Sequence, residues 1–290
     1  MIELNSPNIS KEEIKLTLEA LKSGWVSEGK YLRLFENKFK KYIKSKYAVS
    51  CVNGSSALHL ALKVIKANKD TEVLVPSVSF IATANSVIYN NASPVFLGVN
   101  KYLNLDEESL INFIKHNTYK KNGKLFNKKT KKRIIALTVV HVFGNCANLN
   151  LLKKICKKNN IYLIEDAAES LGSFYINKKK KIHSGTLGDI GCFSFNANKI
   201  ITTGGGGMIV TNNKNLSEKA RFLANQAKKN SIYFDHTEIG YNYRLPNVNC
   251  AIGCAQIGKI NKFKKLKIKN FKLFKKYFDK TIEVLNAPIY

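Results

Sequence analysis

The fold of this chain is indicated most clearly by the segment Cys192-Phe-Ser-Phe-Asn-Ala-Asn-Lys199-Ile-Ile-Thr-Thr-Gly-Gly-Gly-Gly207-Met-Ile-Val210. An apolar, strand-like run leads into a short polar turn with one lysine, and four glycines precede a second strand-like run. A lysine held in a tight loop between strands, beside backbone without side chains, suits covalent attachment of a flat cofactor. The segment therefore predicts that Lys199 forms a Schiff base.

A second informative segment lies upstream and reads Ile161-Tyr-Leu-Ile-Glu-Asp166-Ala-Ala-Glu169, an apolar strand that ends in acids. A lone carboxylate at the end of a buried strand is costly, and pairing Asp166 with a protonated pyridine nitrogen removes that cost. The alternative is that Asp166 caps a following helix. Together with Lys199, Asp166 completes the minimal signature of pyridoxal phosphate (PLP) chemistry, in which the freed lysine acts as general base and acid.

Strand-like and helix-like segments alternate along most of the chain. We expect strands at 47–52, 72–75, 94–98, 133–140 and 162–165, and helices at 55–66, 80–89 and 149–158. Such alternation builds a mostly parallel sheet covered by helices on both faces. The Lys- and Asn-rich stretch 115–132 is expected to be an exposed insertion.

The pattern changes after Gly258. Apolar residues then recur at roughly helical spacing between lysines, which predicts a long amphipathic helix: Ile260, Phe263, Leu266, Phe271, Phe274 and Phe278. A basic amphipathic helix can bind membranes. We expect this one to pack its apolar stripe on the large domain instead, with its lysines in water.

Length and composition limit the class of protein. The 290 residues suffice for one large domain and part of a second. No apolar run approaches the roughly 20 residues that span a bilayer, and the N-terminus does not look like a signal peptide. None of the six cysteines forms a Cys-x-x-Cys pair, so reduced thiols of a cytoplasmic protein are expected rather than disulfides or a metal site.

The net charge of +28 is extreme. It does not predict a nucleic-acid partner, because the excess is almost all lysine and is spread along the chain. A positive field would nevertheless attract phosphate-bearing ligands, including a nucleotide sugar.

The two segments above, together with Asn53-Gly-Ser-Ser-Ala-Leu58 and Gly240-Tyr-Asn-Tyr-Arg244, resemble the DegT-type sugar nucleotide aminotransferases. These are fold type I PLP enzymes, related to aspartate aminotransferase, and the resemblance runs from about Pro7 to the end of the chain. It implies an α/β fold with a mostly parallel, seven-stranded-type sheet between helices. It also implies a large PLP-binding domain at 1–245 and, at 246–290, the start of a smaller α+β domain that is expected to be incomplete.

The resemblance implies the roles of several residues around the cofactor. Ser55, Ser56 and Ser194 bind its phosphate, with Asn196 beside Ser194, although a plain turn and helix cap at Asn53-Gly-Ser-Ser56 would look the same. Phe80 stacks on the ring, or else packs in the core.

Further roles follow from the same resemblance. Ala168 packs on one ring face, and Glu169 lies near the phenolic oxygen. Asn242 reaches the phosphate of a neighbouring subunit, which implies a homodimer with shared active sites. Trp25 either lies near the sugar nucleotide or is a hydrophobic anchor. Independently of the resemblance, the place of His141 at a strand end puts it near the ring, in a structural or supporting role.

The activity that the resemblance implies is PLP-dependent transamination of a nucleotide-linked keto sugar, with L-glutamate as donor, for surface polysaccharide. The run Gly204-Gly-Gly-Gly207 resembles the branch that aminates C4 of UDP-4-keto-6-deoxy sugars. One alternative is another fold type I enzyme, such as an amino-acid lyase or a sugar dehydratase, although the dehydratases carry histidine in place of Lys199. The other alternative is a non-catalytic regulatory protein that retains the fold.

Overall fold

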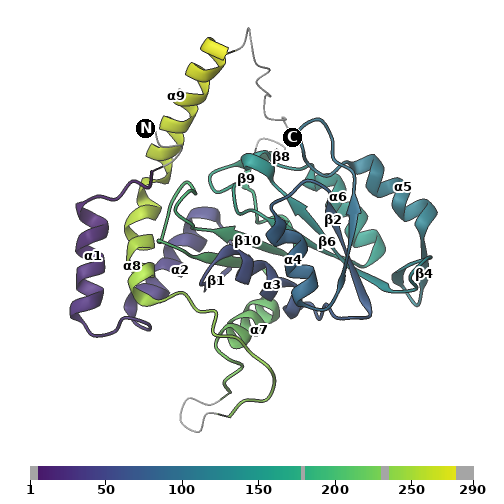
Figure 1. Ribbon diagram of the computed structural model, residues 1–290, viewed down its shortest axis with the longest axis horizontal. Coiled ribbons are helices and arrows are strands. Elements are labelled where there is room, and N and C mark those ends of the chain that lie inside the picture. Colours follow the sequence, from purple (N-terminus) through teal and green to yellow (C-terminus); the bar gives the residue numbers. More distant parts are fainter. Residues whose placement is uncertain (1–5, 178–179, 230–234, 279–290) are drawn as a thin grey trace.

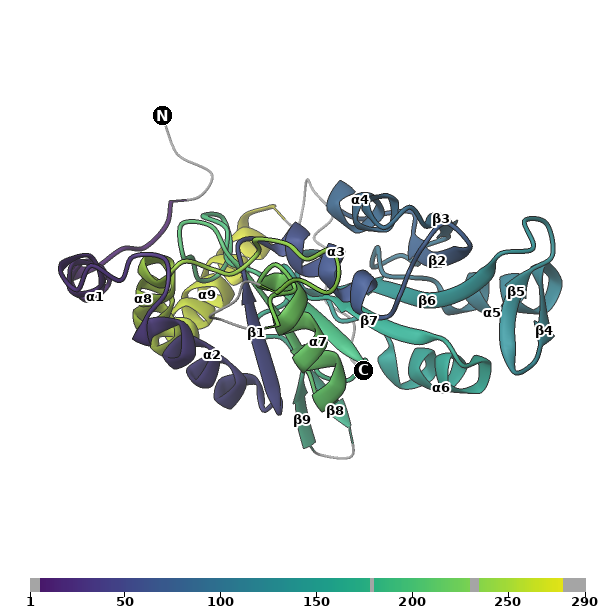
Figure 2. The same cartoon turned by 90° about the horizontal axis from the view of Figure 1, so that it is seen from below.

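The computed structural model describes residues 6–177, 180–229 and 235–278. The described residues form a central sheet whose main path is β1-β11-β10-β7-β6-β2-β3, with helices on both faces (Figures 1 and 2). The strands of this path are β1 Tyr47–Cys51, β2 Thr71–Pro76, β3 Ser93–Leu97, β6 Arg133–Val140, β7 Tyr162–Asp166, β10 Ile190–Ser194 and β11 Gly207–Thr211. From β10 to β3 all pairs are parallel, whereas β11 is antiparallel to both β1 and β10. The α/β class and the mostly parallel sheet are thus confirmed.

Two helical layers enclose the sheet, because neighbouring residues of each buried strand point to opposite faces. Ile164 of β7 lies in the core beneath α3, α4 and α7, and Leu163 lies in the core beneath α5 and α6. A third core joins α2 and α8 to β11 through Met208 and Val210. The helices of these layers are α2 Lys30–Ile43, α3 Gly54–Val64, α4 Ile81–Tyr89, α5 Glu107–Asn117, α6 Leu149–Asn159, α7 Lys214–Ala224 and α8 Asn247–Gln256.

Helix α1 (Lys11–Lys22) and helix α8 tie the two ends of the described chain together. The α1 helix begins with a capping box, in which Ser10 and Glu13 bind each other's backbone or side chain. The side chain of Asn247, at the start of α8, accepts a hydrogen bond from the Tyr31 amide (2.9 Å) and donates one to the Trp25 carbonyl (2.6 Å). Hence α8 packs between α1 and α2, and the division of the chain at residue 245 stays a prediction.

The predicted strands and helices agree with the observed ones to within one or two residues. The segment 115–132 is mostly exposed, as expected, but it has regular secondary structure and is joined to the sheet. This segment contains the end of α5 and a hairpin of β4 (Thr118–Lys121) and β5 (Lys124–Asn127), and β5 pairs with β6. Leu125 of β5 is buried in the core that also contains Leu110 and Ile134. A second hairpin, β8 (Phe174–Asn177) with β9 (Lys180–His183), stands apart from the main sheet.

The predicted C-terminal helix is present as α9 (Ile260–Phe278), but the expectation that its apolar stripe packs on the large domain is wrong for most of its length. Ile260 is buried and Phe263 is partly buried against the α2–α8 core. Beyond them Leu266, Phe271 and Phe274 are exposed, and α9 projects from the body of the molecule (Figure 1). No helix among the described residues is both long and apolar enough to cross a membrane.

The six cysteines are all free, and all but Cys146 are fully buried. Burial raises the pKa of Cys51, Cys156 and Cys254 to about 12, so these thiols stay protonated near neutral pH. Protonated, buried thiols are poor metal ligands and react slowly.

Candidate functional site

A cavity of about 430 Å³ opens beside the carboxyl ends of the parallel strands β6, β7 and β10. Ligands of open α/β sheets bind at this edge, because the loops after parallel strands gather there. The cavity wall comes from five segments that are far apart in sequence: Asn53–Ser55 after β1, Val78–Phe80 before α4, His141–Phe143 after β6, the residues around Asp166 at the end of β7, and 194–199 after β10. Of the predicted site residues, this wall includes Ser55, Phe80, Asp166, Ala168, Glu169, Ser194, Asn196 and Lys199.

Asp166 is a buried carboxylate at the end of β7. Its Oδ2 accepts a hydrogen bond from the Thr83 hydroxyl (2.7 Å), and its Oδ1 accepts one from the Ala168 amide (3.2 Å). Burial raises the pKa of Asp166, and these two hydrogen bonds act in the opposite direction. No helix begins directly after Asp166, so the capping alternative does not apply. Two neutral donors leave a buried carboxylate short of partners, and the free side of this carboxylate borders the cavity.

Glu165, the neighbour of Asp166, lies on the opposite face and is fully engaged within the protein. Its carboxylate accepts hydrogen bonds from the backbone amides of Gly185 (2.6 Å) and Leu187 (2.8 Å), and also from Gly188. A fourth hydrogen bond comes from His141 Nε2 (2.9 Å). Sequence reasoning missed this role of Glu165, because its partners lie about twenty residues further along the chain.

His141 belongs to the cavity wall and also connects two segments around it. The imidazole is fully buried, and its Nδ1 accepts a hydrogen bond from the Ala147 amide (3.2 Å). An accepting Nδ1 places the proton on Nε2, which therefore donates to Glu165. The histidine thus connects the turn after β6 with the end of β7.

Lys199 lies in the loop between β10 and β11, where its amide donates to the Asn196 carbonyl (3.0 Å). Its Nζ is 3.1 Å from Oε1 of Glu169. The other oxygen of Glu169 accepts a hydrogen bond from the Phe143 amide (3.0 Å). Glu169 therefore holds the lysine amine next to the turn after β6, and both side chains are within reach of a ligand in the cavity.

The start of α3 offers positive backbone charge to the cavity. The side chain of Asn53 caps this helix by accepting a hydrogen bond from the Ser56 backbone amide (2.7 Å). Ser56 is absent from the cavity wall. Ser55 and Gly54 line the cavity. A Cβ on Gly54 would lie 2.9 Å from Cβ of Ser194, so glycine is needed for the close approach of α3 to β10. A helix start with serine hydroxyls beside it is a common phosphate seat.

Two other residues that the sequence singled out lie away from the cavity. Asn242 is exposed and forms an isolated bridge with Asn225, so its expected contact with a second subunit stays a prediction. Trp25 is 65% exposed and is absent from the cavity wall.

A second cavity of about 670 Å³ continues from the first. The two share Phe143, Glu169 and Lys199, and the second extends to Lys264 and Lys267 of α9. Phe143 is exposed and has a φ of 52°, which is uncommon for a bulky side chain. Together the two cavities provide room and positive charge for a ligand much larger than the first cavity alone could hold.

The side chains present fit pyridoxal phosphate. A flat pyridine ring with a phosphate and an aldehyde needs an amine, a carboxylate for the ring nitrogen and a phosphate seat. Lys199, Asp166 and the start of α3 with Ser55 and Ser194 supply these groups around one cavity. The exposed Phe80 ring borders the same space.

Comparisons with known proteins show the family to which the chain is similar. The family model of the DegT/DnrJ/EryC1/StrS aminotransferase family matches residues 7–288. The chain is 37% identical over 262 residues to a GDP-perosamine synthase of Caulobacter vibrioides, covering 90% of this chain and 65% of the relative. It is 35% identical over 263 residues to the UDP-4-amino-4,6-dideoxy-N-acetyl-beta-L-altrosamine transaminase of Campylobacter jejuni, covering 90% and 65%.

A solved structure shows the same likeness. PseC of Helicobacter pylori, an aminotransferase involved in the biosynthesis of pseudoaminic acid, has a TM-score of 0.83 and 28% identity. The match covers 95% of this chain and 70% of that chain. This chain thus spans about two thirds of the length of the proteins it matches.

Proposed function

The chain belongs to the DegT/DnrJ/EryC1/StrS aminotransferase family, and we propose that it transfers an amino group from an amino acid to a nucleotide-linked keto sugar, with pyridoxal phosphate as cofactor. One observation carries the proposal. Lys199 and Asp166 reach the same cavity from the ends of β10 and β7, and the start of α3 lies across it. Amine, carboxylate and phosphate seat thereby surround a space of cofactor size.

PLP, when bound, supplies an electron sink that stabilises negative charge on the carbon that loses its proton. Lys199 would hold the cofactor through Nζ, and the same amine would accept and return the proton. Asp166 would keep a proton on the ring nitrogen, because its buried carboxylate would gain a charged partner in this way. Thr83 and the Ala168 amide fix the direction of that carboxylate, and Glu169 positions the Nζ of Lys199.

For the substrate, we propose C4 of a UDP-4-keto-6-deoxy sugar, with L-glutamate as donor. The name of the Campylobacter relative specifies a 4-amino-4,6-dideoxy sugar linked to UDP, which supports amination at C4, whereas the Caulobacter relative is named for a GDP sugar. The second cavity, with Lys264 and Lys267, is where we propose that the diphosphate of the nucleotide binds.

We also propose a homodimer with shared sites. The exposed position of Asn242 supports it, because an exposed amide is free to reach a second subunit. The test mixes Lys199→Ala subunits with Asn242→Ala subunits after exchange has been shown by mass. Hybrid dimers should regain one intact site, and mixtures as inactive as both parents contradict the sharing.

The activity is tested in two stages on protein loaded with PLP. The visible absorbance of the cofactor should shift on adding L-glutamate and should not shift on adding D-glutamate. A panel of UDP-, GDP- and dTDP-linked 4-keto-6-deoxy sugars then identifies the acceptor by mass spectrometry of the amino product. A spectral shift with no product from any sugar would contradict the acceptor class, and no shift with any of the common L-amino acids would contradict transamination.

A further inference from the structure

Phe143 lies at the junction of the two cavities around Lys199. Six of the described residues line both cavities: Phe143, Ala168, Glu169, Ser194, Asn198 and Lys199. The other five are small, polar or charged, so Phe143 is the one large apolar residue of this set, and it is 78% exposed. A ligand that extends from the first cavity into the second therefore passes an uncovered aromatic ring.

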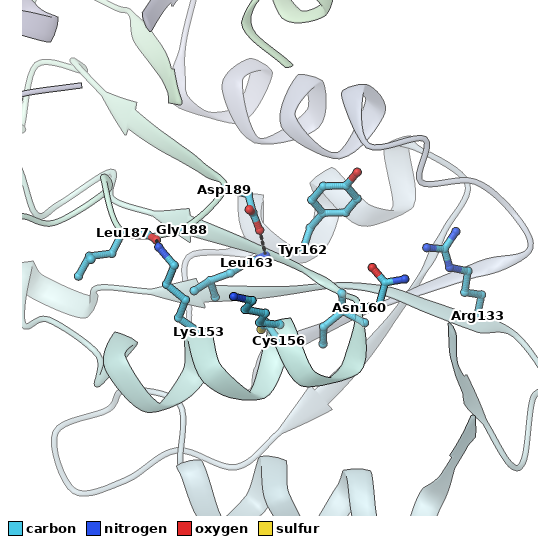
Figure 3. A pocket seen from close by; sticks show the side chains of 11 residues that line it. Arg133, Lys153, Cys156, Asn160, Tyr162, Leu163, Leu187, Gly188 and Asp189 are labelled. Carbon is cyan, nitrogen blue, oxygen red and sulfur yellow. Dashed lines mark hydrogen bonds between the residues drawn. The ribbon is translucent and has the colours of Figure 1, made fainter. Parts of the chain in front are cut away.

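A third cavity, of about 320 Å³, cannot hold the same ligand. Arg133 and Tyr162 in its wall are the first residues of β6 and β7, whereas the Lys199 cavity lies at the last residues of these strands (Figure 3). The third cavity shares no residue with the other two. An acceptor that reacts at Lys199 is therefore confined to the two cavities that meet at Phe143.

Two hydrogen bonds connect the backbone of Phe143 to the amine of Lys199. The Phe143 amide donates to Oε2 of Glu169 (3.0 Å), and Lys199 Nζ donates to Oε1 of the same carboxylate (3.1 Å). A single carboxylate group thus separates the amine from the turn that carries the ring. A sugar whose reacting carbon meets this amine has its neighbouring carbons close to Phe143.

The fold imposes this position of Phe143. Its φ of 52° and ψ of 23° lie in the left-handed region, which is uncommon for a bulky residue. The turn is held by hydrogen bonds from the His141 amide to the Asp166 carbonyl (3.1 Å) and from the Gly144 amide to the His141 carbonyl (3.0 Å). The Ser173 hydroxyl also donates to the Gly144 carbonyl (2.8 Å). Strained positions of this kind cluster at ligand sites, because the surrounding structure must maintain them.

We propose that Phe143 determines which sugars are accepted, by packing against the C6 methyl group of a 6-deoxy sugar. The inference rests on the proposed amination at C4, because C6 is attached to C5, the neighbour of C4. A sugar with C4 at Lys199 and its diphosphate near Lys264 and Lys267 lies across the junction. Covering an exposed ring with a methyl group is favourable, whereas a 6-hydroxyl would lose hydrogen bonds to water against the same ring.

The test uses nucleotide sugars that cannot be aminated, so the result does not depend on turnover. UDP-glucose and UDP-6-deoxyglucose differ only in the 6-hydroxyl, and both carry a hydroxyl in place of the 4-keto group. In calorimetric titrations of the PLP-loaded full chain, UDP-6-deoxyglucose should bind about tenfold more tightly. GDP-mannose and GDP-6-deoxymannose repeat the comparison, because the contribution of the nucleotide cancels within each pair.

The variants isolate the ring from the turn that carries it. Phe143→Asn removes the ring and should reduce the preference to less than about twofold. Asparagine adopts a positive φ more readily than phenylalanine, so this variant should keep or exceed the wild-type melting temperature, which excludes misfolding. Phe143→Tyr keeps the ring and should keep the preference. Tyr102→Ala is the matched control, because Tyr102 lines the second cavity alone, and it should leave the ratio of the two dissociation constants unchanged.

Failure of the inference is distinguishable from failure of the proposed function. Equal binding of both sugars of a pair by the wild type would overturn the role of Phe143 and leave the acceptor class intact. A preference that survives in Phe143→Asn, or that disappears in Tyr102→Ala, would assign the discrimination to other residues. Absence of binding of either pair below about 1 mM would contradict the nucleotide sugar itself, and the inference with it.

Discussion

The two faces of the sheet at the end of β7 carry adjacent acids in opposite situations. On one face Glu165 accepts hydrogen bonds from three backbone amides and a histidine. On the other face Asp166 has two neutral donors, and burial raises its pKa. The difference separates an acid that holds the fold together from an acid that the fold holds ready for a ligand. Substitutions at the two positions should therefore change opposite properties of the protein.

The largest effect on activity is expected at Lys199, which borders the same cavity as Asp166. Lys199→Ala removes both the attachment point of the cofactor and the amine that moves the proton, so turnover should fall by about 1,000-fold or more. Steady-state rates measure this loss, and borohydride reduction with peptide mapping should place the pyridoxyl group on Lys199 in the wild type. Lys214→Ala, an exposed lysine on α7, is the control. A pyridoxyl label on another lysine would refute the assignment.

Asp166→Asn should separate activity from stability. Turnover should fall by about 100-fold, because an amide cannot hold a proton on the ring nitrogen. The cofactor-free protein should be as stable as the wild type or up to ~1 kcal/mol more stable, since the substitution removes a buried charge. The amide oxygen can still accept from Ala168, and the Thr83 hydroxyl can rotate to accept from the new NH₂ group.

Urea unfolding of the cofactor-free protein and initial rates of the loaded protein check both parts of this prediction. A variant that keeps near-normal rates would contradict the pairing with the ring nitrogen. A loss of several kcal/mol of stability would show that Asp166, like Glu165, is structural.

Glu165→Gln is expected to lower stability and leave activity nearly unchanged, which is the reverse of the expectation for Asp166→Asn. The new NH₂ group would face backbone donors of the Gly185–Gly188 loop, so the free energy of unfolding should fall by about 3 kcal/mol. The activity of the molecules that remain folded should change little, because the side chain points away from the cavity. Denaturation curves and rates normalised to bound PLP distinguish the two. An unchanged midpoint with a large loss of rate would reverse the comparison.

A smaller effect is expected from a comparison of Glu13 with Asp166. The contributions of these two carboxylates to stability should depend on pH in opposite directions. Burial alone would raise its pKa, but hydrogen bonds from Lys259 and Ser10 prevail and lower it to about 2. The stability contributed by this group is present above its ordinary pKa of 4.5 and is lost as pH falls from 4.5 to about 2. For Asp166 the sign is opposite: a raised pKa means that its contribution declines as pH rises through its ordinary value of 3.8.

Glu13→Gln should therefore cost roughly 1–2 kcal/mol at pH 7 and less at pH 3. Asp166→Asn should gain more at pH 7 than at pH 3. Melting temperatures across this range measure both, and two parallel pH profiles would contradict the signs.

The sequence was enough to predict the residues proposed to carry the chemistry, Lys199 and Asp166. It was not enough to predict the hydrogen bonds that hold the surrounding segments in place. Lys199 and Asp166 stand at the ends of apolar runs, and a run followed by a polar turn is visible without coordinates. The role of Glu165 is not visible, because its partners belong to a loop whose position depends on the whole sheet. The Ser55–Ser56 pair is ambiguous for a similar reason: only Ser55 reaches the cavity wall, and the sequence does not show which of the two serines does.

Composition and periodicity left part of two segments unpredicted. The lysine-rich segment 115–132 is mostly exposed, as expected, but its composition did not reveal the β4–β5 hairpin or the pairing with β6 that buries Leu125. At α9 the regular apolar spacing predicted packing along the whole helix, whereas the packing is limited to the region of Ile260 and Phe263. Periodicity shows that a helix has an apolar face, but the partner of that face depends on distant parts of the fold.

The pairing of β1 with β11 affects how the chain folds while it is being synthesised on the ribosome. Tyr47 lies opposite Thr211, and β1 is the terminal strand of the main sheet path. During synthesis β1 therefore waits for its partner while the intervening chain is made, which takes on the order of ten seconds or more at ribosomal speed. The start of α3, which follows β1 directly, is fixed in place only after that strand has paired. Pairing of this kind is slow, because the loop between the strands must close first. The lysine loop and the phosphate seat should thus be among the last parts of the nascent chain to assemble.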